Sequence, residues 1–138
     1  MIQNFSISIA NDYAYTIHRT YMTDDIKAIM LAIDNFTSAR EWDQFHTPKN
    51  LAASLLIESA ELMECFQWDN PSTEEVKANP KLLNQCSEEI ADIFNYAFRL
   101  YSILSIDPKE AIMGKIRLNE EKYPVEKSKG SSKKYTDL

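Results

Sequence analysis

The sequence of 138 residues predicts an all-α protein, and two observations carry that prediction. First, three segments open with the same signal, a residue that can cap a helix N-terminus followed by a proline. These segments begin at Thr47-Pro48, Asn79-Pro80 and Asp107-Pro108. Second, the chain holds only two glycines and five prolines, too few turn residues for a sandwich or barrel of many short strands. We therefore expect a single four-helix bundle.

The first helix is expected to begin at Thr23, because this capping residue precedes two acids that favour a helix N-terminus. Apolar residues then recur at helical spacing. They are Ile26, Ile29, Met30, Ile33 and Phe36. Residues 1–22 do not share this period, and residues 5–9 alternate weakly, as in a strand. We assign residues 1–22 to an irregular or weakly strand-like N-terminal extension.

The remaining helices follow from the three cap-and-proline signals. The second is expected to run from Pro48 to about Phe66, and residues 68–71 break it. A loop with a possible short turn leads to the third helix, from Pro80 to about Leu104, and the fourth runs from Pro108 to just before Tyr123. The predicted organisation is an extension over 1–22, a helical domain over 23–126 and a basic tail over 127–138.

Composition narrows the function before any motif is considered. The net charge of −6, from 15 basic and 21 acidic residues, disfavours a binder of nucleic-acid polymers and suits a cation binder. Gly114 and Gly130 stand alone, so a glycine-rich phosphate loop is excluded. Two cysteines cannot build a metal knuckle and predict free thiols in a reducing cytoplasm. A run of about 18 apolar residues is absent, so no membrane span is expected.

Four carboxylates occupy matched positions on the second and third predicted helices. At 100° per residue, Glu58 and Glu89 each fall only about 20° outside the apolar stripe of their helix. Glu61 and Asp92 lie about 60° further round on the same flank, and Tyr96 lies between Glu89 and Asp92. Spacing of three residues between acids is weak evidence by itself. Their position beside the core is stronger evidence, because a carboxylate there is costly unless it is paired or bound to a metal.

These four acids lack a lysine or arginine one turn away on their own helix. An all-oxygen cluster suits Mg²⁺, with Mn²⁺ as a possible substitute, rather than zinc. A di-iron bundle is disfavoured because the Glu-x-x-His motif does not occur. The alternative is that Arg99, Arg117 or a lysine of another helix neutralises the acids.

The pattern Glu58-x-x-Glu61 followed by Glu89-x-x-Asp92 resembles the metal-binding signature of the MazG-like, all-α nucleotide pyrophosphohydrolases. The resemblance covers residues 24–138 and is strongest to the dCTP pyrophosphatase branch. Its longest shared segments are residues 40–46, 48–51, 61–68, 88–93, 122–125 and 134–138, together with Lys115 and Asn119. The resemblance implies that all four acids are catalytic metal ligands.

The resemblance also implies a substrate site. Trp42, His46 and Trp68 would surround the pyrimidine base, whereas core packing is the alternative role for the two tryptophans. Tyr96 and Asn119 would hold sugar or phosphate oxygens. The position of Tyr96 beside two acids supports its role independently. Lys115 and Lys122 would bind phosphates, whereas the alternative is that they simply face solvent.

The activity implied by the resemblance is Mg²⁺-dependent hydrolysis of dCTP or base-modified dCTP to the monophosphate and pyrophosphate, which cleanses the nucleotide pool. The resemblance further implies a homodimer or homotetramer with sites between subunits, in the cytoplasm. Two alternatives stay open. One is a less selective enzyme acting on dUTP or purine triphosphates, and the other is a helical adaptor without catalysis.

Overall fold

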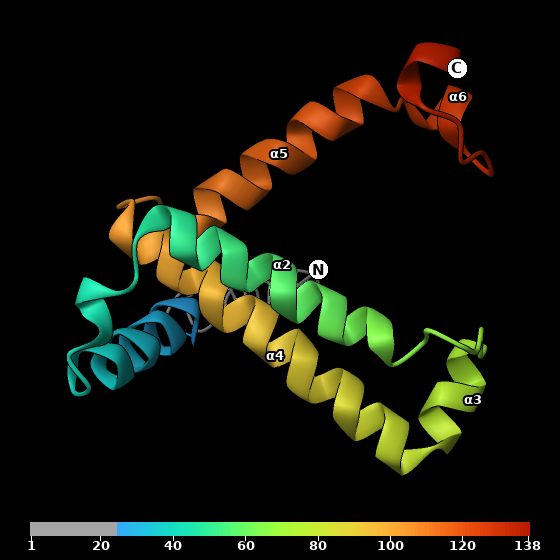
Figure 1. Ribbon diagram of the computed structural model, residues 1–138. Coiled ribbons are helices and arrows are strands. Elements are labelled where there is room, and N and C mark those ends of the chain that lie inside the picture. Colours follow the sequence, from blue (N-terminus) through green and yellow to red (C-terminus); the bar gives the residue numbers. More distant parts are fainter. Residues whose placement is uncertain (1–24) are drawn as a thin grey trace, which may run out of the picture. The chain divides into compact units, whose positions relative to one another are not determined.

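The structure is a computed structural model that describes residues 25–138 (Figure 1). Every regular element within this range is a helix, so the all-α prediction is confirmed. The expected cap Thr23 and the extension over 1–22 lie outside the described residues. The chain divides after Leu104 into two compact units, the second spanning Ser105–Leu138.

The described part of the first unit, from residue 25 on, opens with a helix over residues 25–38, followed by a single 3-10 turn, η1 (Trp42–Gln44). Its two long helices, α2 (Pro48–Glu64) and α4 (Pro80–Ile103), start where the sequence predicts. The side chain of Thr47 accepts a hydrogen bond from the amide of Asn50, and that of Asn79 accepts one from Leu82. Each side chain satisfies an amide that has no partner within its helix.

A short helix, α3 (Thr73–Ala78), occupies the loop for which the sequence predicts only a possible turn. The Ser72 hydroxyl accepts from the Glu75 amide at 3.3 Å, and the Glu75 carboxylate accepts from the Ser72 amide at 2.7 Å. The hydrogen bonds from Ser72 lower the pKa of Glu75. This reciprocal capping box is legible in the sequence as Ser-Thr-Glu-Glu.

Helices α2 and α4 pack against each other and run in opposite directions (Figure 1). Leu51 of α2 is 1% exposed and Cys86 of α4 is 6% exposed, so the apolar stripes predicted from the helical wheel do form the core. Both cysteines are free thiols, as expected. The antiparallel pairing brings the acid-bearing flanks of the two helices together.

The second unit contains α5 (Pro108–Lys122), α6 (Val125–Ser128) and η2 (Tyr135–Asp137). Asp107 caps α5 by accepting from the Glu110 amide at 3.1 Å, as the sequence predicts. The two short helices α6 and η2 were not predicted from the sequence. The ring of Tyr123 meets that of Tyr135 edge to face at 5.9 Å, which fastens the end of the chain to the end of α5. Within residues 25–138, no helix combines the length and hydropathy that a membrane crossing requires.

Candidate active site

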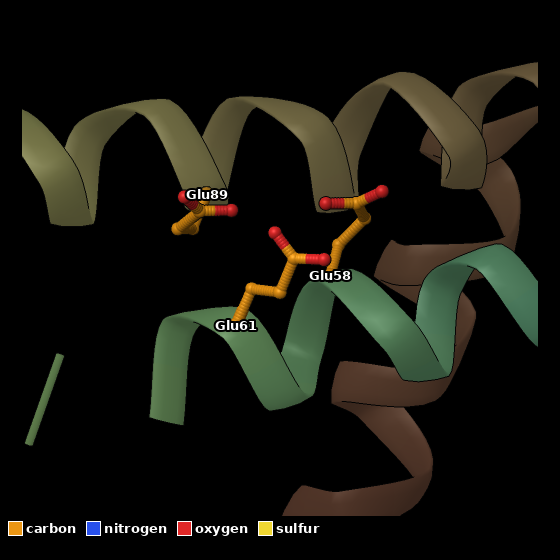
Figure 2. A group of neighbouring side chains, drawn as sticks. All are labelled: Glu58, Glu61 and Glu89. Atoms are coloured by element: carbon orange, nitrogen blue, oxygen red, sulfur yellow. The ribbon is translucent and has the colours of Figure 1, made fainter. Parts of the chain in front are cut away.

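Three carboxylates from the paired helices meet in one cluster (Figure 2). Glu58 and Glu61 extend from α2 toward Glu89 of α4, and one oxygen of each carboxylate lies within 4.8 Å of the others. Glu58 and Glu89 are half-buried, and Glu61 is exposed. The predicted convergence of these three acids is therefore present in the fold.

The electrostatics of the cluster show that its negative charges repel one another. Partial burial and then the carboxylates of Glu61 and Asp92 raise the pKa of Glu58 above its ordinary value. The same causes, in the same order, raise the pKa of Glu89. Asp92 lies outside the group of three yet close enough to act on both. The cluster would be stabilised by a cation that neutralises this repulsion.

This repulsion predicts a pH-dependent stability for the metal-free protein. Because the folded-state pKa of Glu58 and of Glu89 is raised, the folded chain holds these protons more tightly than the unfolded chain. Their stabilising contribution is complete below the unfolded-state pKa of 4.5 and is lost as the pH rises through the folded-state values. Glu58→Gln should therefore raise the metal-free Tm at about pH 7 by roughly 1–3 °C. The gain in Tm should vanish at about pH 4.

The measurement is thermal unfolding in the presence of a chelator, across pH, for the wild type and the variant. Addition of Mg²⁺ should raise the wild-type Tm more than that of the variant. A lower metal-free Tm for Glu58→Gln at neutral pH would contradict mutual repulsion within the cluster.

Arg99 does not neutralise the acid cluster, which was one of the sequence-based alternatives. Its guanidinium forms ion pairs with Asp34, at 2.7 Å, and with Asp43. These are the ion pairs found within residues 25–138. Arg99 is therefore fully engaged elsewhere in the first unit, and that form of the alternative is wrong.

A pocket of about 380 Å³ adjoins the cluster: Asp92 lines this pocket and lies close enough to Glu58 to raise its pKa. The pocket is formed by the helix over residues 25–38, η1 and α4. It contains four residues predicted for the site from the sequence: Trp42, His46, Asp92 and Tyr96. The remaining lining residues were not predicted: Ala32, Ile33, Phe36, Thr37, Asn95 and Arg99. The pocket thus combines aromatic walls with a polar end.

Local structure fixes the aromatic wall. The Arg40 guanidinium lies 3.6 Å from the centre of the Phe36 ring, and its Nη1 donates to the Phe36 carbonyl at 2.9 Å. The Phe36 ring meets Trp42 edge to face at 5.9 Å. Glu41 takes a left-handed conformation with φ 56°, which lets the chain turn sharply into η1. Trp42 is 43% exposed, so packing within the core is not its role in the single chain.

The polar end of the pocket was not predicted from the sequence. No role was assigned to Asp34 or Asp43, and Arg99 was considered only as a counterion for the acid cluster. A signal was present, because Arg99 follows Asp92 by seven residues and therefore lies on the same flank of the helix two turns later.

Four predicted substrate residues lie outside this pocket. Trp68 is 86% exposed and follows the end of α2. The other three belong to the second unit, where they share one face of α5 at successive turns: Lys115, Asn119 and Lys122. The Lys122 ammonium also lies 5.3 Å from the centre of the Tyr135 ring. The roles assigned to these four residues stay predictions.

Comparison with known proteins assigns the chain to a family. The model of the MazG-like family matches residues 53–138. Over 104 residues the chain is 38% identical to dCTP pyrophosphatase 1 of Rattus norvegicus and 34% identical to that of Homo sapiens. Each match covers 75% of this chain and 61% of the relative, so the chain spans about three-fifths of the length of these curated relatives.

A solved structure agrees with the sequence relatives. The crystal structure of a pyrophosphatase from Archaeoglobus fulgidus superposes with a TM-score of 0.60 at 39% identity, covering 78% of this chain and 93% of that one. The matched helices include those that carry the four acids, since the family model begins at residue 53. The chain belongs to the MazG-like family.

Proposed function

We propose that this protein is a nucleotide pyrophosphohydrolase that cleaves dCTP or base-modified dCTP between the α- and β-phosphates, releasing the monophosphate and pyrophosphate. One observation carries the proposal: the cluster of Glu58, Glu61 and Glu89 adjoins an aromatic pocket, and Asp92, which lines that pocket, raises the pKa of both Glu58 and Glu89. The pocket suits a base and the cluster suits the cations that accompany a triphosphate. The names of the relatives, dCTP pyrophosphatase 1, support the same substrate class.

The donor set fits a divalent cation. Its oxygen-only ligands favour Mg²⁺, or Mn²⁺ in its place, and the raised pKa of Glu58 and of Glu89 marks a site whose negative charges a cation would relieve. The residues that would hold the metal are Glu58, Glu61, Glu89 and Asp92. When bound, such a cation supplies charge neutralisation for the phosphates and acidifies a coordinated water.

The remaining steps belong to the side chains of the chain itself. Trp42 offers a flat face for stacking the base, and Tyr96 lines the pocket beside Asp92, where a sugar or phosphate oxygen would lie. One of the four acids, or a carboxylate released from the metal, would accept the proton of the attacking water. The face of α5 that carries Lys115, Asn119 and Lys122, together with the basic tail over 127–138, would bind phosphates. The helical domain would span residues 23–126.

We also propose that the protein assembles as a homodimer or homotetramer with sites completed between subunits. Leu56 and Met63 of α2 are 72% and 64% exposed in the single chain and lie on one face of the helix. That face points more than about 90° away from the stripe centred on Leu51. Pairing of this face between chains would bury it and bring Trp68 of one chain toward the pocket of another.

The substrate class is tested by turnover of a panel of nucleoside triphosphates with Mg²⁺, Mn²⁺ and a chelator. We expect dCTP and its 5-modified forms to have the highest kcat/KM, with turnover lost in the chelator. Equal kcat/KM for dUTP or the purine triphosphates would favour the less selective enzyme. Absence of turnover and of any Mg²⁺-dependent thermal shift with a nonhydrolysable triphosphate would favour the adaptor. A cytoplasmic role in nucleotide-pool cleansing depends on the first outcome.

A further inference from the structure

A buried arginine organises the polar end of the pocket. The side chain of Arg99 is 9% exposed, and each of its nitrogens donates to a different partner. Nη1 donates to Asp34 at 2.7 Å, Nη2 donates to Asp43, and Nε donates to Nδ1 of His46 at 3.4 Å. These three partners explain how the charged side chain of Arg99 is tolerated although it is itself largely buried.

Both aspartates are themselves held in place. The Ser102 hydroxyl donates to Asp34 at 2.8 Å, and the Ser38 hydroxyl donates to Asp43 at 2.8 Å. The guanidinium is therefore fixed from two sides, by the helix over residues 25–38 and by the η1 segment. Such support leaves Arg99 little freedom to change its contact with His46.

The contact with Arg99 determines which nitrogen of His46 carries the proton. A guanidinium has only donors, so Nδ1 of His46 must be the acceptor and must be unprotonated. The neutral ring then carries its proton on Nε2. Burial and the Arg99 charge lower the pKa of His46, outweighing the opposing effect of Asp43, which keeps the ring neutral at pH 7.

We propose that Arg99 is a positioning residue that holds His46 as the Nε2–H tautomer, and that this N–H reads the ring N3 of a cytosine base. N3 of cytosine accepts a hydrogen bond, whereas N3 of uracil or thymine carries a proton and repels a donor. The pocket would then discriminate between the pyrimidines, because the fixed Nε2–H donor of His46 would face an acceptor in cytosine but another donor in uracil or thymine. This inference rests on the proposed function and adds the group that sets its base preference.

The tautomer is tested directly by nitrogen NMR of the imidazole side chains in the intact protein. We expect one His46 signal pattern with the proton on Nε2. The signals of His18 are assigned by comparison with His46→Gln. In Arg99→Met and Arg99→Lys the fraction of the Nε2–H tautomer should fall toward that of a free imidazole, since methionine has no donor and lysine lacks the planar Nε–H that faces Nδ1. A proton on Nδ1 in the wild type would overturn the proposal, whatever the activity of the enzyme.

The reading of the base is tested with two matched substitutions of His46. Glutamine places an amide N–H close to the Nε2 position, whereas the shorter asparagine places it close to Nδ1. We expect His46→Gln to keep most of the preference for dCTP over dUTP and His46→Asn to lower it at least about tenfold, mainly through the KM for dCTP. Arg99→Lys should also lower the preference for dCTP over dUTP. Lys77→Met on α3 is the control: it removes a charge outside the pocket and should leave this preference unchanged.

The outcomes separate the two proposals. Equal pyrimidine preference in the glutamine and asparagine variants, with both variants folded by circular dichroism, would overturn the role of His46 in reading N3. If the wild type hydrolyses no triphosphate, the proposed function fails, and the NMR experiment still decides whether Arg99 fixes the tautomer.

Discussion

Asp92→Asn and Glu58→Gln are each expected to lower metal-dependent pyrophosphate release by at least about 1,000-fold while leaving the helices intact. Each change removes one negative charge from a cluster that the fold holds at an electrostatic cost, as the raised pKa of Glu58 shows. The substituted amides are close in size to the carboxylates, so packing between α2 and α4 should persist. Turnover is measured as pyrophosphate released, and folding as helicity and Tm.

Glu88→Gln provides the matched control for this prediction. Glu88 precedes Glu89 in α4, but its carboxylate is directed along the helix, where it accepts from the Asn84 amide at 2.8 Å. Its side chain is outside the group of three that could hold an ion. We expect turnover within about twofold of the wild type. Activity near the wild-type level in both cluster variants would show that these acids do not serve the reaction.

The second large effect is expected for the double variant Leu56→Glu, Met63→Glu. Two charges on the exposed apolar face of α2 should separate the subunits, because like charges would meet across a symmetric interface. If Trp68 completes the site of a partner chain, kcat/KM should fall by at least about 100-fold. Light scattering after size exclusion measures the assembly, and turnover is assayed on the same fractions.

The control for the interface is Lys77→Glu, which changes the charge of the exposed α3 helix by a similar amount. It should leave both the assembly and turnover unchanged. A double variant that becomes a folded monomer and keeps full activity would refute sites completed between subunits. A wild type that is already monomeric at assay concentration would refute the assembly itself.

The helices were predictable because their signals are local. The caps at Thr47, Asn79 and Asp107 act on amides within three residues, so the sequence contains all the information that the helix starts require. The short helix α3 obeys the same rule, and its capping box could have been recognised at Ser72. The convergence of Glu58, Glu61 and Glu89 also followed from helical periodicity, once two flanking stripes were seen to match.

The polar end of the pocket was not predictable in this way. Asp34, Asp43 and Arg99 are separated by up to 65 residues and come from three different elements, so no periodicity links them. They form a network only because the fold brings the helix over residues 25–38 and η1 against α4. Trp68 illustrates the opposite case: its position after α2 is known and it is 86% exposed in the single chain, so its proposed role requires a second chain.

The position of the cut is the central claim, and hydrolysis of dCTP in ¹⁸O-labelled water with Mg²⁺ tests it most directly. Separation and mass analysis of the products identify both the bond that breaks and the phosphorus atom that water attacks. We predict dCMP and pyrophosphate in equal amounts, with the label in one of the two and no dCDP. Release of dCDP and inorganic phosphate would contradict cleavage between the α- and β-phosphates.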